Sequence, residues 1–158
     1  MSDAGDFIDA ALQYEVSPYS YPAVGSDGLG HYGTSIGAIR GTIRDALKRY
    51  PGMSHDEITA LSSELWAPAV FESRQAAIIL LQANVDSLVA KDLTRIEGFI
   101  RSAGSDALVD ELIADVVAPM LTKINVDAPS PAQTILKRWA SDPDAGVRSV
   151  GRRLGPAG

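Results

Sequence analysis

The fold class is decided by residues 61–81, LSSELWAPAVFESRQAAIILL. Apolar residues recur there at helical spacing, and the polar residues fall on the opposite face. Two further stretches have the same character: residues 32–49, YGTSIGAIRGTIRDALKR, and residues 107–139, which begin ALVDELIADVVAPML and end ILKRW. No segment shows the sustained period-two alternation that is typical of a strand. The sequence therefore predicts an all-α protein without a sheet.

Capping residues and prolines divide these stretches into short helices. Ser54 is followed three residues later by Glu57, the pattern of a capping box. Within residues 34–50 the side chains expected to face inward are those of Ile36, Ile39, Ile43 and Leu47. The remaining helix boundaries are expected at Thr34 or Ser35, Pro51-Gly52, Pro68, Gly104, Pro119 (a bend or a restart), Pro131 and Asp144.

Short helices joined by short loops predict antiparallel helix pairs. Pairs arranged in tandem favour a short, curved α-solenoid of HEAT-like repeats over a bundle. We expect a single domain over residues 1–158, since this length suits one hydrophobic core. Residues 17–33, SPYSYPAVGSDGLGHYG, are expected to form a long loop because they are rich in Pro, Gly and Ser.

Composition excludes several kinds of site. The chain has no cysteine, so it has no disulfide, no thiolate metal ligand and no cysteine nucleophile. Its two histidines, His31 and His55, are far apart in sequence and make no metal-binding pattern. No apolar window approaches the roughly 20 residues of a membrane span, and the acidic N-terminus MSDAGDFIDAAL has no signal core. We expect a cytoplasmic protein without a metal.

Charge is unevenly distributed along the chain. The net charge of −6 counts against a dedicated nucleic-acid binder, which is usually basic. Residues 133–158, however, contain five cations against two anions. A local basic patch matters more than the total charge for binding a polyanion. The cations of this segment are Lys137, Arg138, Arg148, Arg152 and Arg153.

Three stretches carry a family resemblance. Residues 31–47, HYGTSIGAIRGTIRDAL, contain a tyrosine-glycine start to a helix that bears an arginine. Residues 58–82, ITALSSELWAPAVFESRQAAIILLQ, contain a leucine-tryptophan helix followed by a helix with a glutamate and an arginine. The third stretch combines ALVDELIADVVAPML with residues 136–154, LKRWASDPDAGVRSVGRRL. In this order and spacing they resemble the DNA alkylation repair enzymes built from HEAT-like repeats, the alkylpurine DNA glycosylases.

The resemblance implies a reaction centred on Asp110. In the family, a carboxylate beside aromatic side chains lines a concave, positively charged groove, and the family's aspartate corresponds to Asp110 here. The implied chemistry is cleavage of the N-glycosidic bond of an alkylated purine in duplex DNA. A nearby anion stabilises the oxocarbenium-like transition state, so the reaction needs no cofactor and no metal. The alternative, from spacing alone, is an ordinary aspartate on the surface near the start of a helix.

The resemblance also implies DNA-binding residues. The cations expected to contact phosphate are Arg148, Arg152, Lys137, Arg138, Arg74 and Arg40, and the aromatic residues expected to line the groove are Trp139 and Tyr32. Arg148 and Arg152 are four residues apart and so share a helix face. The alternatives are a solvated basic end to the last helix and, for Trp139, packing in the core.

Two departures from the family pattern leave a second function open. The family usually has a tryptophan four residues before its aspartate, and this chain has Asp106 there. Family members also continue through further helix pairs, whereas this sequence stops shortly after Arg153. The alternative function is therefore a catalytically inactive helical scaffold that binds a protein partner on its inner face.

Overall fold

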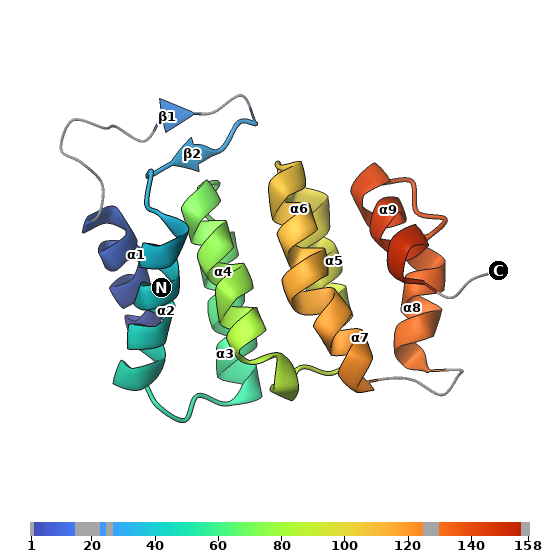
Figure 1. The fold of residues 1–158 in the computed structure, drawn as a ribbon, viewed down its shortest axis with the longest axis horizontal. Helices are drawn as coiled ribbons and strands as arrows, with labels where there is room; N and C mark the ends of the chain where they lie inside the picture. Colours follow the sequence, from blue (N-terminus) through green and yellow to red (C-terminus); the bar gives the residue numbers. More distant parts are fainter. Residues whose placement is uncertain (1, 15–22, 25–26, 125–129, 156–158) are drawn as a thin grey trace. The chain divides into compact units, whose positions relative to one another are not determined.

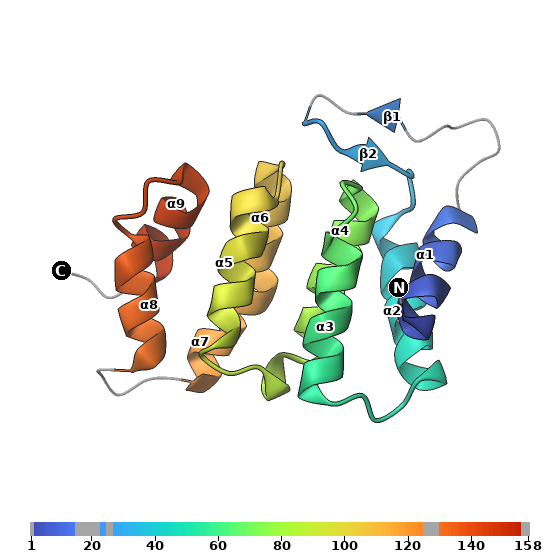
Figure 2. The ribbon, with the colours of Figure 1, turned by 180° about the vertical axis from the view of Figure 1, so that it is seen from behind.

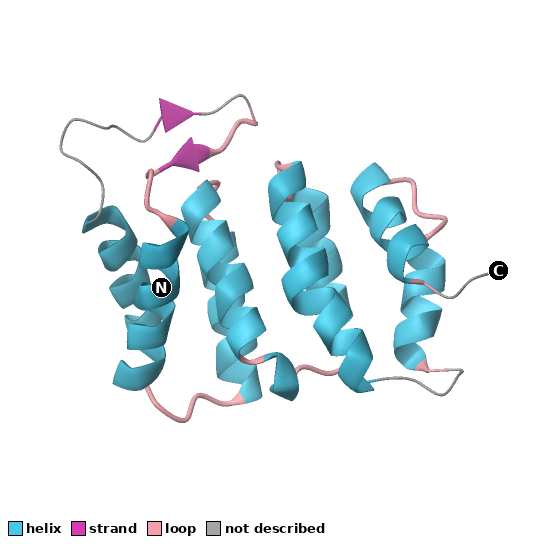
Figure 3. Cartoon of the chain, viewed as in Figure 1, coloured by secondary structure: helices cyan, strands magenta, loops and turns pink. Residues whose placement is uncertain are grey.

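The structure is a computed structural model that describes residues 2–14, 23–24, 27–124 and 130–155. Within these residues almost all regular structure is helical (Figure 3). The fold is all-α, as the sequence predicts. The chain divides into two compact units, Met1–Asn84 and Val85–Gly158, which we call the N-terminal unit and the C-terminal unit. The predicted loop 17–33 lies partly outside the described residues.

The described residues of the N-terminal unit form two helix pairs and a small hairpin (Figure 1). Helix α1 contacts α2 and α3, and α2 contacts α4. Helices α3 and α4 lie side by side in both views of the chain, joined by residues 67–70 (Figure 2). The elements are α1 (Asp3–Tyr14), β1 (Ala23–Val24), β2 (Gly30–His31), α2 (Ile36–Arg49), α3 (His55–Trp66) and α4 (Phe71–Ala83).

The described part of the C-terminal unit is also built from paired helices. Helix α5 contacts α6 and α9, and α8 pairs with α9. The elements are the 3-10 turn η1 (Val85–Ser87), α5 (Asp92–Ser102), α6 (Asp106–Leu112), the π-helical segment η2 (Ile113–Val117), α7 (Ala118–Ile124), α8 (Pro131–Trp139) and α9 (Ala145–Leu154).

Side-chain caps start several helices where the sequence predicts them. The Ser54 hydroxyl accepts from the Glu57 N–H while the Glu57 carboxylate accepts from the Ser54 N–H, which completes the capping box. Three other caps each accept from the backbone N–H three residues on: Ser35, Ser130 (followed by Pro131) and Asp144. These caps satisfy N–H groups that have no partner inside the helix.

The helix that begins at Asp106 is distorted before Pro119. The Ala118 N–H donates to the carbonyl of Ile113, five residues back rather than the four of an α-helix, so η2 is a π-helical turn. Pro119 has no N–H, and its ring would clash with the carbonyl of Asp115 in an undistorted helix. The helix is therefore distorted about one turn before the proline at which the sequence predicts a bend or a restart.

Helix α4 contacts α1, α2, α3 and β2 of the N-terminal unit. Every residue from Glu72 to Leu81 is buried, as expected for a helix that is covered on all sides. The buried stripes of α2 and α3 include Ile39, Ile43 and Leu65. Ile36 is a correction to the sequence prediction, because it is 46% exposed at the first position of α2, where the packed face ends.

The two strands form an antiparallel hairpin that the sequence did not predict. Ala23 pairs with His31 and Val24 with Gly30. The Gly30 N–H also donates to the carbonyl of Ala69 at 2.8 Å, which fastens the hairpin to the α3–α4 connection. The pairing places Tyr32, which follows β2, beside the start of α4.

Candidate functional site

Asp110 lies on the exposed face of α6. Leu108 and Leu112, two positions before and after it, are fully buried, whereas 65% of the Asp110 side chain is exposed. The apolar residues around Asp110 in the sequence therefore do not enclose it; they form the opposite, buried face of the helix. The carboxylate is accessible to a ligand.

Arg153 of α9 is the partner of this carboxylate. The Arg153 Nη1 donates to Asp110 Oδ1 at 3.3 Å, and 56% of the Arg153 side chain is exposed. The contact brings together two residues that are 43 positions apart, from the polar faces of α6 and α9. An ion pair this exposed contributes little to stability, but it places a cation beside the candidate catalytic group.

The other predicted cations of the C-terminal unit differ in their contacts with protein acceptors. Lys137 and Arg152 are exposed. The Arg148 Nη1 donates to the carbonyls of Asp142 and Pro143 at 3.1 and 3.3 Å, so this guanidinium closes the α8–α9 loop. Arg138 lies 3.6 Å from a Glu97 carboxylate oxygen. The basic segment thus combines exposed cations with cations that already hold protein acceptors.

A second ion pair joins α5 to the α8–α9 loop. The Arg101 guanidinium donates to both carboxylate oxygens of Asp142, at 2.9 and 2.5 Å. Hydrogen bonds from Arg101 and from the Asp144 N–H lower the pKa of Asp142 from 3.8 to about 2. Sequence reasoning missed this pair, because its members are 41 residues apart.

Arg74 does not fit the predicted role in phosphate binding. It is 7% exposed, and its Nε donates to the carbonyls of Trp66 and Pro68 at 3.0 and 3.1 Å. The guanidinium also lies 5.3 Å from the centre of the Trp66 ring, and burial lowers its pKa. Arg74 satisfies the carbonyls at the end of α3 and ties α3 to α4.

Trp139 does not fit the predicted role in the groove. Its side chain is fully buried, and its Nε1 has no hydrogen-bond partner among the described residues. Trp139 is the last residue of α8, the helix that pairs with α9, and it belongs to the buried core. Trp139 therefore packs in the core, as in the alternative given by the sequence.

Tyr32 and Arg40 lie in the N-terminal unit. The Tyr32 N–H donates to the buried carboxylate of Glu72 at 2.7 Å, and its hydroxyl lies 3.4 Å from an Asp9 carboxylate oxygen. Burial, followed by the charge of Asp9, raises the pKa of Tyr32. Arg40 is exposed on α2. That these residues share one groove with Asp110 stays a prediction.

The described residues contain neither a metal-ligand cluster nor a membrane-spanning helix. In the described part of the chain no three His, Cys, Asp or Glu side chains are placed to hold a metal ion. Over the same residues, no helix is long and apolar enough to cross a bilayer.

Comparison with known proteins identifies the family. A family model described as "DNA alkylation repair enzyme" matches residues 16–152, a range that includes Asp110, Arg148 and Arg152. No curated protein and no solved structure matches the chain. The family match extends over most of the sequence and over both units. The chain therefore belongs to the DNA alkylation repair enzyme family.

Proposed function

We propose that the protein binds duplex DNA carrying alkylated purines and hydrolyses the N-glycosidic bond of the alkylated base, with Asp110 as the essential carboxylate. The observation that carries the proposal is the placement of Asp110 in a member of this family. The carboxylate is exposed on α6, with Arg153 beside it. The same unit contains the exposed cations Lys137 and Arg152.

The reaction needs little from the protein beyond this anion. An alkylated purine already carries positive charge, so the electron pair of the breaking bond neutralises the departing base. Positive charge then develops on the sugar, where a fixed carboxylate stabilises it. Water adds to the sugar carbon, and its proton passes to Asp110 or to solvent.

Arg153 has two roles in this proposal. It orients the Asp110 carboxylate, since it donates to Oδ1. It also offers N–H groups to a DNA phosphate, because a guanidinium binds phosphate oxygens in the same way as carboxylate oxygens. A phosphate that draws Arg153 toward itself strengthens the field of Asp110 at the sugar.

DNA binding is tested by its dependence on salt. Each phosphate contact releases counterions, so the logarithm of the binding constant falls linearly with the logarithm of the salt concentration. We expect measurable affinity for duplex DNA at low salt, a steep decrease on adding salt, and release of methylated purine from alkylated duplex. Absence of binding at low salt would rule out the proposal, whereas binding without base release would retain only a damaged-DNA binder.

The second candidate function is a protein-binding scaffold without catalysis. It is favoured by Asp106, where the family usually has tryptophan. This residue is exposed in the first turn of α6, four positions before Asp110, and a second carboxylate there repels phosphate. The scaffold predicts no affinity for duplex DNA at any salt concentration, so the binding measurement also separates the two functions.

A further inference from the structure

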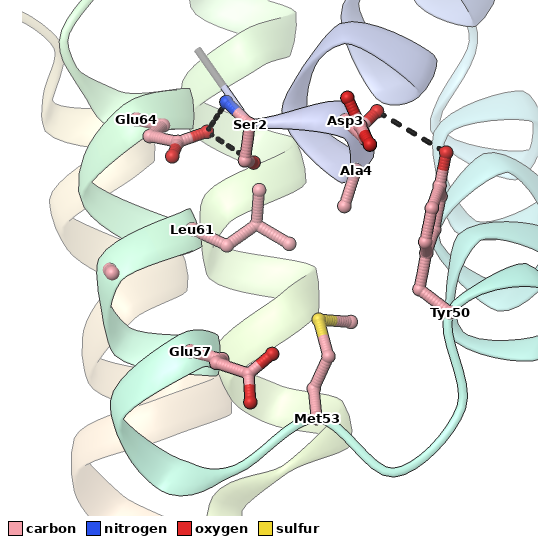
Figure 4. A pocket seen from close by; sticks show the side chains of 9 residues that line it. Ser2, Asp3, Ala4, Tyr50, Met53, Glu57, Leu61 and Glu64 are labelled. Atoms are coloured by element: carbon pink, nitrogen blue, oxygen red, sulfur yellow. Dashed lines mark hydrogen bonds between the residues drawn. The ribbon is translucent and has the colours of Figure 1, made fainter.

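The N-terminal unit contains a cavity that the proposed function does not use. It has a volume of about 310 Å³ and lies between the start of α1, the end of α2 and the outer face of α3 (Figure 4). That volume is at the lower end of the range for small-molecule sites. All the residues that line it belong to the N-terminal unit.

The floor of the cavity is apolar. Leu61 is 3% exposed and Ala4 is 8% exposed. The Met53 side chain rises from the α2–α3 loop into the space between Leu61 and the Tyr50 ring (Figure 4). These groups present methyl, thioether and ring surface, which favours a ligand with an aliphatic body.

The rim of the cavity carries three carboxylates, and hydrogen bonds hold two of them in place. Glu64 Oε2 accepts from the N–H and the hydroxyl of Ser2, at 3.1 and 2.8 Å. Glu57 Oε1 accepts from the Ser54 N–H at 3.4 Å. Each of these carboxylates therefore keeps its second oxygen for another donor. The third, Asp3, stands at the first turn of α1.

The described lining of the cavity offers no cation to balance these charges. Among the described residues that line it, none is a lysine or an arginine. The neighbouring cation in sequence, Arg49, lies over the rings of Phe7 and Tyr50 instead. An apolar floor beneath carboxylates that no described lining cation balances is complementary to a ligand that joins an aliphatic chain to a positive charge.

We propose that this cavity binds an alkylammonium group. The aliphatic chain packs on Leu61, Met53 and the Tyr50 ring, and the ammonium donates to Glu64. Glu57 lies at the other end of the cavity, about two helical turns away on α3, and contributes its charge from there (Figure 4). A lysine side chain has this form, with a stem of about four methylenes and three N–H donors. A free aliphatic amine shares the same chemistry, and the experiment distinguishes the two sources.

Titration by nuclear magnetic resonance tests the cavity directly. We expect n-hexylammonium to cause saturable shifts of the Met53, Leu61 and Tyr50 signals, and n-hexanol, which has the same body without the charge, to bind more weakly. A peptide with one central lysine provides the second arm.

Binding of either cation supports the proposal. Tighter binding of the peptide identifies a protein lysine as the source, and tighter binding of hexylammonium identifies a free amine. Absence of saturable shifts with both, or equal binding of hexanol, would overturn it.

Conservative variants locate the charge. Glu57→Gln retains the capping box, since glutamine serves at this position as well as glutamate, and Glu64→Gln retains an oxygen that accepts from Ser2. Glu64→Gln is expected to weaken hexylammonium binding about five-fold, and Glu57→Gln, at the other end of the cavity, to weaken it less. The control is Asp56→Asn, an equal change in charge on α3 at a residue outside the cavity, which is expected to change affinity less than two-fold. An equal loss in the control would show long-range electrostatics rather than a site.

Discussion

Gly151 of α9 lies directly against Ala140, at the end of α8. A Cβ built on Gly151 would stand 2.3 Å from the Ala140 backbone nitrogen and 2.6 Å from the Trp139 carbonyl carbon. Both of these atoms belong to the backbone, so neither can turn aside as a flexible side chain would. The pairing of α8 with α9, and hence the position of Arg153 beside Asp110, depends on the absence of a side chain at Gly151.

Gly151→Ala is therefore expected to lower the free energy of unfolding by about 3 kcal/mol, at the upper end of the usual cost of overpacking. Gly98→Ala is the matched control, because Gly98 lies in α5 of the same unit with open space around the added methyl. It is expected to raise stability by about 0.5–1 kcal/mol, since alanine favours a helix over glycine. Urea denaturation of both variants makes the measurement. Equal effects would contradict the close approach of α8 and α9.

Arg74 is expected to act on stability rather than on DNA binding. Arg74→Met preserves much of the side-chain volume but leaves the carbonyls of Trp66 and Pro68 without this donor, which costs about 1–3 kcal/mol. Arg40→Met, on the exposed face of α2, is expected to change stability by less than about 0.5 kcal/mol. Thermal unfolding compares the two. A stable Arg74→Met protein that loses DNA affinity would restore the phosphate-binding interpretation.

Replacing Trp139 by a smaller aromatic residue is expected to leave DNA affinity unchanged. Trp139→Phe keeps an aromatic ring in the core and removes the indole N–H that has no partner among the described residues. The variant is expected to fold and to bind duplex DNA within about two-fold of the original affinity, because a fully buried ring has no surface to offer a base. Fluorescence anisotropy with labelled duplex measures this. A large loss of affinity in a folded variant would place Trp139 in the groove.

The Asp142 carboxyl is expected to titrate near pH 2, since Arg101 and the Asp144 N–H lower its pKa from 3.8 to about 2. The folded-state pKa lies below the unfolded value, so the stabilisation is complete above about pH 4 and disappears as the pH falls through about 2. Arg101→Gln should move the midpoint back toward 3.8. Carboxyl chemical shifts measured against pH test both statements. A midpoint near 3.8 in the unchanged protein would show that the pair does not form in solution.

Local signals account for the parts of the fold that the sequence predicts well. The Ser54 capping box and the Asp144 cap depend on residues three positions apart, and Pro131 starts a helix through its own backbone geometry. Pro119 signals a distortion but not its place, because the strain is relieved in the preceding turn, over Ile113–Val117. The β1–β2 hairpin leaves no periodic pattern, since each strand has two residues.

The candidate site depends more on contacts between distant residues, which spacing cannot reveal. Asp110 and Arg153 are 43 positions apart, and their ion pair exists only because α9 returns to α6. The burial of Arg74 and Trp139 also depends on neighbouring helices, so the residue types that suggest DNA binding turn out to serve the core. The sequence leaves open whether Asp110 is a catalytic carboxylate or an ordinary surface aspartate. A side chain that is 65% exposed suits both.

Base release from methylated duplex DNA by the Asp110→Asn protein is the most direct measurement. Asp86→Asn provides the control, because Asp86 is another exposed carboxylate of the C-terminal unit and is paired with Lys123. We predict that the unchanged protein and Asp86→Asn release 7-methylguanine or 3-methyladenine, while Asp110→Asn binds the same DNA but releases base about a hundredfold more slowly or not at all. Undiminished release by Asp110→Asn would contradict the proposed role of this carboxylate.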